Sequence, residues 1–247
     1  MINNTRRNKN IGTAKQGHGQ NNKLTIAEPY CTSKYFYERL YKYTKTKKII
    51  NGHEFVFIIE KVRDTSVHSC SIEDIQTIIE QIPESDYGDL KFIVFRQPKR
   101  KEEILSPVWG RLIYIYEFED EYLPAIIIDA IDLTKKLKLS NKLTLEQKKE
   151  LERLKNDGHE IINDGRYYIA ELKKENVRNT QLYRTLLHEF GHYVHYLELV
   201  ERPSKDEQDY EKRKELYFKI PTEEKEKYAN NYAEKLYSEL KARNIIP

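Results

Sequence analysis

The segment 188–192, which reads HEFGH, constrains the fold of this chain more than any other part of the sequence. It lies in a strongly helical stretch, predicted at about 179–200, that ends shortly before a proline. Helix residues four apart face the same way, so His188 and His192 point in one direction. Two imidazoles at this spacing can bind one tetrahedral zinc ion. Glu189 lies about 100° around the helix from His188, beside such a metal but not bound to it.

This arrangement suits metal-assisted hydrolysis. A zinc ion lowers the pKa of a bound water to about 7, and a neighbouring carboxylate can take the proton before the hydroxide attacks a carbonyl. We therefore predict His188 and His192 as metal ligands and Glu189 as the catalytic base. The alternative is an ordinary amphipathic helix with surface histidines, but apolar flanks favour a buried active-site helix. Gly191 costs about 1 kcal/mol of helix propensity relative to Ala, which indicates that another element approaches closely there.

The candidates for the third metal ligand can be reduced by elimination. His195 lies seven residues beyond His188, about 10 Å along the helix, so it cannot readily share a metal with both motif histidines. We expect a groove-lining or structural role for it. Since no histidine follows His195 in the sequence, a downstream carboxylate is favoured as the third ligand.

Glu226 has the best surroundings among these carboxylates. Ala229 and Ala233 share its helix face and would let that helix pack tightly against the motif helix. Asn230, at i+4, is predicted to accept a hydrogen bond from the far nitrogen of a ligand histidine. Glu223 shares this face too, but a lysine stands four residues after it, and lysine is only a donor. Glu226 as one solvated charge in an acidic helix is the alternative.

The two motifs together resemble a known family. HExxH is followed, 34 residues after His192, by ExxANxYA beginning at Glu226. This pair is similar to the glutamate-zincins, and most similar to the ImmA/IrrE-type metallopeptidases, whose second motif typically reads ExxANxFA. The lead-in RTLL at 184–187 is also similar to that family. The likeness covers about 160–240.

The resemblance implies a zincin-like fold, zinc held by His188, His192 and Glu226, and Glu189 as the catalytic base. It also implies regulated cleavage of one specific protein. The sequence departs from the family in having Tyr232 for the usual Phe and in lacking the usual LLMP ending. A weaker likeness exists to the lethal-factor-like peptidases, which share HEFGH and a distant glutamate.

Other features bear on the site without settling it. A second electrophile beside zinc usually stabilises the oxyanion, and Tyr196, Tyr217 and Tyr228 are candidates among which the sequence does not choose. The segment 109–111, WGR, either lines a groove or belongs to the core. A peptide substrate could add to a sheet edge as an extra strand. Histidines without ligand-like spacing are His18, His53, His68 and His159.

The remaining periodicity predicts an α+β fold, with a mixed sheet in the middle and helices around it and at the C-terminal end. Helices are expected at about 33–48, 71–82, 144–155, 179–200, 205–219 and 223–242. Capping boxes at Ser71 and Thr144 open the second and third, and Thr222 is the expected N-cap of the last. Strands are expected at 55–59, 90–95, 112–118 and 123–131, with a hairpin around Asn163-Asp164-Gly165.

Charge divides the chain unevenly. Residues 1–50 hold eleven Lys/Arg and two Asp/Glu, whereas the rest holds 32 basic and 38 acidic residues. We predict a disordered basic arm at 1–28, an N-terminal α+β region at 29–135 that contributes the sheet, and a zincin-like catalytic region at 136–247. The arm is either a solubilising segment or a contact for nucleic acid or an acidic partner.

Two cysteines imply no disulfide framework, and the sequence has neither a signal-peptide pattern nor an apolar run of membrane-span length. We therefore expect a cytoplasmic protein with no membrane contact. The leading interpretation is a zinc endopeptidase acting on a protein or peptide. The alternative is a catalytically idle, zinc-containing regulatory or nucleic-acid-binding protein.

Overall fold

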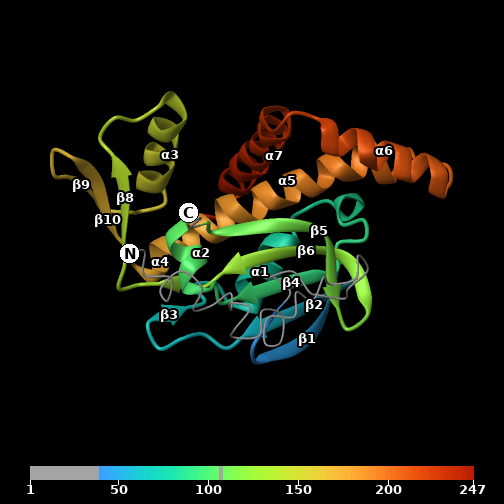
Figure 1. The fold of residues 1–247 in the computed structure, drawn as a ribbon, viewed down its shortest axis with the longest axis horizontal. Helices are drawn as coiled ribbons and strands as arrows, with labels where there is room; N and C mark the ends of the chain where they lie inside the picture. The colour runs from blue at the N-terminus through green and yellow to red at the C-terminus, as the bar shows by residue number, and fades with distance from the viewer. Residues whose placement is uncertain (1–38, 106–107) are drawn as a thin grey trace, which may run out of the picture. The chain divides into compact units, whose positions relative to one another are not determined.

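The computed structural model describes residues 39–105 and 108–247, whose elements are drawn in Figure 1. The predicted arm at 1–28 and the first part of the predicted helix at 33–48 lie outside these residues. Within them, a mixed sheet, two smaller sheets and several helices make up an α+β fold, as the sequence predicts.

The central sheet has five strands in the order β1-β2-β4-β6-β5. Their bounds are β1 Tyr43–Ile50, β2 His53–Glu60, β4 Phe92–Arg96, β5 Gly110–Phe118 and β6 Glu121–Asp129. The three inner strands are parallel to one another, while β1 and β5 are antiparallel edge strands. The predicted strands from 55 onward are thereby confirmed, with small shifts at their ends.

Side chains of the inner strands are buried on both faces of the sheet, which explains their nearly continuous apolar runs. One face joins the main core with α1 (Ile72–Ile79) and the motif helix. The residues of that face are Phe55, Phe57, Ile93, Phe95, Ile126 and Ile128. The opposite face forms a smaller cluster of Val56, Ile58, Phe92, Val94, Tyr116, Phe118, Ala125 and Ile127.

The helix predicted at 33–48 is wrong where it can be examined, because β1 is a strand over Tyr43–Ile50. This strand forms because the Asn51-Gly52 pair makes a turn, in which both residues have positive φ, 49° and 80°. This two-residue turn pairs Ile50 with His53 and continues as an antiparallel ladder to Glu60. Asn-Gly is a strong hairpin signal, and it outweighs the short helical spacing of aromatic residues before it.

The predicted helix at 179–200 is one continuous helical segment that starts earlier, at Lys174. It comprises α4 (Lys174–Thr180), a π-helical turn η3 (Gln181–Leu186), α5 (Leu187–Tyr196) and a second π-helical turn η4 (Leu197–Glu201). The HEFGH motif therefore lies on α5, between two π-helical turns. Such turns are frequent at functional sites.

Most of the other helices follow their predicted capping signals. Ser71 and Thr144 form the expected capping boxes at the starts of α1 and α3 (Leu145–Asn156). The last two helices are α6 (Glu207–Lys219) and α7 (Thr222–Ala242). Thr222 is the first helical residue of α7 and not its N-cap, which is Pro221 without a side-chain cap. A short helix, α2 (Arg100–Leu105), and the 3-10 turn η2 (Glu84–Asp86) were not expected.

The smaller sheets lie outside the central one. The predicted hairpin is confirmed as β9 (Ile161–Asn163) and β10 (Tyr167–Glu171), with Gly165 at φ 91° in the turn. It pairs with β8 (Lys136–Ser140) in a three-stranded sheet, order β8-β10-β9, and β3 (Ser66–Val67) pairs with β7 (Ile131–Asp132). In the part of the chain that is described, no helix combines the length and apolarity that crossing a membrane requires.

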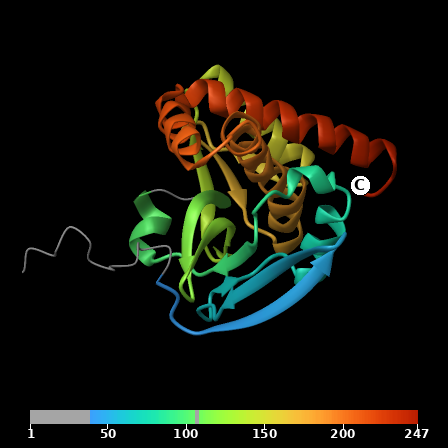
Figure 2. The ribbon, with the colours of Figure 1, turned by 90° about the vertical axis from the view of Figure 1, so that its right-hand side faces the viewer.

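The position of α5 matters most for function. It contacts the edge strand β5 on one side and α7 on the other. Figure 2 shows α7 running across the other helices, on the side away from β1 and β2. Two helices distant in sequence are thus held against each other above one edge of the sheet.

Candidate metal centre

The three predicted ligand side chains lie together at the contact between α5 and α7. Nε2 of His188 is 3.2 Å from Oε2 of Glu226, and Nε2 of His192 is 3.3 Å from Oε1 of the same carboxylate. One potential ligand atom from each residue lies within 4.8 Å of the other two. Elimination from the sequence and the observed packing therefore lead to the same three residues.

The separations suit a tetrahedral ion. Zinc binds nitrogen and oxygen at about 2.0–2.2 Å, which places neighbouring ligand atoms of a tetrahedron about 3.4 Å apart. The two observed N–O distances, 3.2 and 3.3 Å, are close to this value. The two imidazole rings are perpendicular, at 89°. The Glu226 side chain is 47% exposed, so one side of the centre remains open to solvent, as a catalytic site requires.

The charges at the centre are strongly coupled. Hydrogen bonds from His188 and His192 hold the pKa of the Glu226 carboxyl well below its usual range. Desolvation would lower the pKa of His188, but the hydrogen bond to Glu226 and the charge of Glu189 outweigh it and raise that pKa. A carboxylate kept ionised beside two imidazoles is a donor set that a divalent cation can occupy.

Glu189 lies beside the centre and outside the three-residue group, as its position on the helix predicts. Its Oε2 accepts a hydrogen bond of 2.7 Å from the backbone N–H of Leu112, on β5. Burial raises the pKa of Glu189, while the charges of His188 and His192 oppose this shift. The carboxylate is thus held in place by the edge strand and favours taking up a proton more than an exposed glutamate does.

Gly191 explains how the two helices approach so closely. A Cβ atom at this position would lie 2.8 Å from both Cα and the carbonyl oxygen of Ala229, and 3.1 Å from Cβ of Tyr232. Ala229 is fully buried and Ala233 is 9% exposed, so the small face of α7 meets the motif helix as expected. The close approach predicted from the glycine is confirmed, and α7 is the approaching element.

Asn230 has a different partner from the one predicted. Its Oδ1 lies 3.5 Å from Nη1 of Arg153, on α3. The expected bond to Asn230 from His188 or His192 is absent from the hydrogen bonds of the described residues. Glu223, in the first turn of α7, is exposed and does not belong to the ligand group.

The three candidate tyrosines all have other hydrogen-bond partners. Tyr217 also donates weakly, at 3.4 Å, to the carbonyl of the candidate ligand His192. Of the three tyrosines, Tyr217 is therefore the one whose hydroxyl contacts a residue of the candidate metal centre, and it contacts the backbone of that residue. The hydroxyl partners are Tyr114 for Tyr217 at 2.9 Å, Tyr210 for Tyr196 at 2.8 Å, and Glu198 for Tyr228 at 2.7 Å.

The remaining described histidines occupy structural positions. His195 is buried and stacks on Tyr228, with ring centroids 4.3 Å apart and planes at 14°. This matches the structural role expected for it. His18 lies outside the described residues. The other ring contacts are His53 with the Leu90 carbonyl, His68 with the Glu60 carbonyl, and His159 with the Thr180 hydroxyl.

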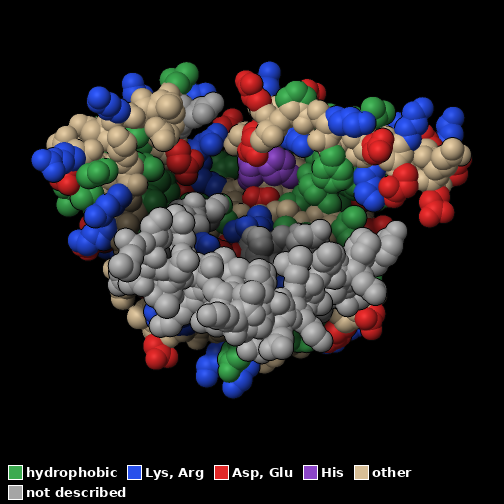
Figure 3. Space-filling model, in the orientation of Figure 1, with side chains coloured by type: hydrophobic (Ala, Val, Ile, Leu, Met, Phe, Trp, Pro, Cys, Tyr) green, Lys and Arg blue, Asp and Glu red, His purple; other side chains and the backbone are tan. Residues whose placement is uncertain are grey.

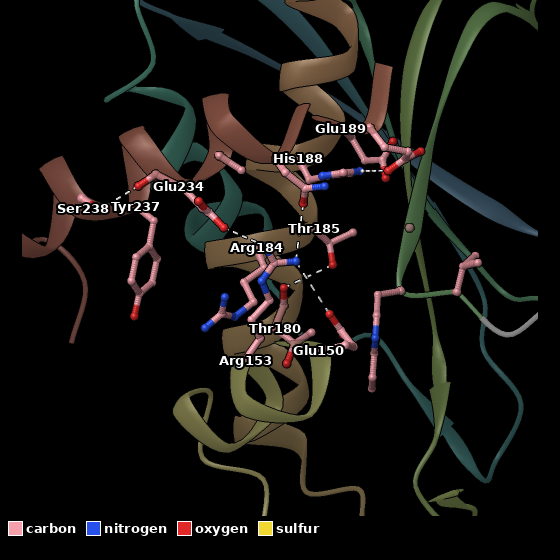
Figure 4. A pocket seen from close by; sticks show the side chains of 16 residues that line it. Glu150, Arg153, Thr180, Arg184, Thr185, His188, Glu189, Glu234, Tyr237 and Ser238 are labelled. Carbon is pink, nitrogen blue, oxygen red and sulfur yellow. Dashed lines mark hydrogen bonds and ion pairs between the residues drawn. The ribbon is translucent and has the colours of Figure 1, made fainter. Parts of the chain in front are cut away.

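A cavity of about 580 Å³ opens beside the metal centre. His188, Glu189 and Glu226 line one part of it, as Figure 4 shows for the first two. Trp109 and Gly110 line another part, so the groove-lining interpretation of the WGR segment is the correct one for these residues. Figure 3 shows histidine and acidic side chains at the surface of a hollow on this face.

The sequence assigned no role to two arginines of this cavity, Arg153 and Arg184. Arg184 is in the lead-in to the motif, four residues before His188 and therefore near it on the helix. The helix periodicity therefore predicts that Arg184 lies on the same face of the helix as His188. Arg153 belongs to α3, and no local pattern connects that helix with the motif.

Comparison of the chain with models of known protein families, with curated proteins and with solved structures found no significant match.

Proposed function

We propose that this chain is a zinc-dependent endopeptidase with a zincin-like active site. One observation carries the proposal: His188, His192 and Glu226 meet at distances that suit tetrahedral zinc, with the non-ligand carboxylate of Glu189 beside them. Structural zinc sites usually have four protein ligands and commonly include cysteine, whereas catalytic sites keep a position open. Three ligands and an adjacent base fit the catalytic class.

The residues divide the work of hydrolysis between them. Bound zinc would supply a water of lowered pKa and would polarise a peptide carbonyl. Glu189 takes the proton from the attacking water and passes it to the leaving amine. Its hydrogen bond from Leu112 fixes the carboxylate relative to β5. Glu189 is therefore positioned by the same strand that borders the site.

Substrate binding by strand addition is consistent with the sheet. β5 is an edge strand, paired on one side with β6, and it lies against the motif helix. Exposed sheet edges can bind an extended peptide through main-chain hydrogen bonds. A peptide added to β5 would pass along Glu189 and the metal centre.

The likeness of the two sequence motifs to ImmA/IrrE-type metallopeptidases favours regulated cleavage of a specific protein over general digestion. The alternative is an idle zinc-containing regulator that uses its basic N-terminal segment to hold nucleic acid or an acidic partner. The intact Glu189 and the open cavity favour the enzyme, since a purely structural zinc would need neither.

The decisive variant is Glu189→Gln, which keeps size and hydrogen bonding but removes the base. We expect wild type and Glu189→Gln to bind one zinc per chain, and only wild type to cleave its target. Comparing the proteomes of cells expressing each form would reveal that target through its fragments. Glu223→Gln, the same substitution at an exposed site on α7, is the matched control and should retain cleavage. Wild-type protein without zinc, or undiminished proteolysis by Glu189→Gln, would contradict the proposal.

A further inference from the structure

The cavity beside the metal centre contains two arginines from different elements. Arg184 lies in η3, four residues before His188, and Arg153 comes from α3. Figure 4 shows both side chains in the same part of the cavity, next to Thr180 and apart from Glu189. Thr185 and Ser238 also line the cavity, with their hydroxyls donating to the carbonyls of Thr180 and Glu234.

Arg184 is held through only part of its guanidinium group. Its Nε lies 2.6 and 2.7 Å from the two oxygens of Asp157, whose side chain is 3% exposed. The ring of Tyr237 packs 5.4 Å from the guanidinium carbon. Among the described residues, the hydrogen bonds of the Arg184 side chain run through Nε, and neither terminal nitrogen makes one. Four N–H donors of a fixed, planar group therefore remain for a ligand.

Arg153 is engaged more loosely. Its Nη2 lies 2.7 Å from Glu234, whose side chain is 65% exposed. Its Nη1 lies 3.5 Å from Oδ1 of Asn230 and 4.0 Å from the carboxylate of Glu150, whose side chain is 44% exposed. Exposed ion pairs contribute little stability, so a ligand can displace Glu234 at small cost. Arg153 can then join Arg184 in binding one anion.

The distance from the metal centre defines which part of a substrate would meet these arginines. Arg184 and His188 are separated by one helical turn, about 6 Å along the axis. An extended peptide advances about 3.3 Å per residue, so this offset corresponds to about two residues.

The direction of β5 indicates which side of the cleaved bond would lie near Arg184. A Cβ at Gly110 would contact Thr185, and Leu112 bonds Glu189, so the strand and the helix run the same way. A peptide antiparallel to β5, the commoner pairing, would extend toward Arg184 with its C-terminal part.

We propose that Arg184, assisted by Arg153, binds a substrate carboxylate about two residues to the C-terminal side of the cleaved bond. The carboxylate belongs either to an Asp or Glu side chain or to the C-terminus of the substrate. This inference rests on the proposed function and names the chemistry of the substrates that the site prefers. Bidentate binding of a carboxylate is the interaction for which a guanidinium group is best shaped.

The test uses peptide hydroxamates, which anchor to zinc in place of the cleaved carbonyl and carry two further residues. One matched pair has Glu or Gln as the second residue, both with an amidated end. A second pair has Ala there, with a free or an amidated C-terminus. Dissociation constants are measured by calorimetry on the full chain loaded with zinc. At least one acidic member should bind roughly tenfold more tightly than its neutral match, as charged hydrogen bonds predict.

Arg184→Met alone would leave the buried Asp157 without its charged partner, with only the Thr180 hydroxyl, among the described side chains, donating to it, and this variant can fail to fold. The second variant, Asp157→Asn with Arg184→Gln, removes both charges together and retains hydrogen-bonding groups. In it, the preference for the acidic member should fall to about one. Lys235→Met removes one positive charge from an exposed position on α7 and is the control. It should leave the preference unchanged.

The outcomes separate this inference from the proposed function. Equal affinities within both pairs on wild-type protein would overturn the carboxylate site, even if the protein cleaves peptides. A preference that disappears in the double variant would support the site, even if no peptide is cleaved, and the peptidase function would then fail alone. A preference that survives in the double variant would exclude Arg184 as its cause. Absence of binding by every hydroxamate would overturn both proposals.

Discussion

Substituting Gly191 by Ala tests whether the metal centre depends on the contact between α5 and α7. The added Cβ would lie 2.8 Å from backbone atoms of Ala229, where ordinary contact begins at 3.4 Å. Backbone atoms cannot rotate away as the end of a flexible side chain does. The helices must therefore separate locally by at least the difference, about 0.6 Å.

The energetic result combines two opposing effects. Overpacking a close contact costs about 1–3 kcal/mol, while replacing a helical glycine by alanine stabilises the helix by about 1 kcal/mol. We expect the free energy of unfolding to fall by about 0–2 kcal/mol. Metal binding should suffer more, because Glu226 stands one turn before Ala229 and moves with it. Metal–ligand distances tolerate about 0.2 Å, so zinc affinity should fall about tenfold or more.

Two measurements on the same protein distinguish these effects. Urea unfolding without metal gives the stability change, and titration against a competing chelator gives zinc affinity. Asn231→Ala, at an exposed position on α7, serves as the control and should change neither by much. A Gly191→Ala protein that is more stable than wild type and binds zinc equally well would refute the reasoning. It would mean that the helices are not in contact at backbone distance.

The remaining predictions concern single carboxyl and amide groups. In zinc titrations against a chelator, Glu226→Gln should lose most affinity and Glu223→Gln almost none; greatest damage from Glu223→Gln would show that the wrong carboxylate was chosen. Because Asn230 contacts Arg153 and not a candidate ligand histidine, Asn230→Ala should also lose little. Burial raises the pKa of Glu201 to about 7, so the folded state holds this proton more tightly than the unfolded chain, whose value is about 4.5. Stability present below pH 4.5 is then lost as the pH rises through 7. Glu201→Gln should therefore raise the melting temperature at pH 8 and have little effect at pH 5, and an equal shift at both would argue against a titrating Glu201.

The motif helix could be predicted from the sequence because its information is local. Histidines four residues apart on a helix face one way whatever surrounds them. Glu226 required a further step, and the small residues Ala229 and Ala233 supplied it. They mark the face of α7 that packs closely, and the carboxylate on that face is the one that reaches the histidines.

The parts that were missed depend on contacts between distant residues. β1 was predicted as helix because aromatic spacing was given more weight than the Asn51-Gly52 turn that fixes its register. The bond that places Arg153 in the cavity joins it to Glu234, 81 positions away. Neither residue stands out in the sequence, because α3 and α7 both carry many acidic and basic side chains. The Asp157–Arg184 pair is equally invisible, since only burial distinguishes it from other charges.

The geometry of the candidate metal centre is set as much by small residues as by the three proposed ligands. Gly191 lies between the two histidines on α5, and Ala229 lies one turn after Glu226 on α7. Their contact brings the two backbones together, so the short Glu226 side chain spans the remaining gap to both imidazoles. The hydroxyl of Tyr232 on α7 also donates to Asp86 at 2.9 Å, and this bond connects α7 to the segment before β4. A larger residue at either small position would leave every ligand in the sequence but separate them in space. The HExxH pattern alone therefore does not specify the site, because the glycine within it and the alanine facing that glycine set the distance at which one ion can be shared.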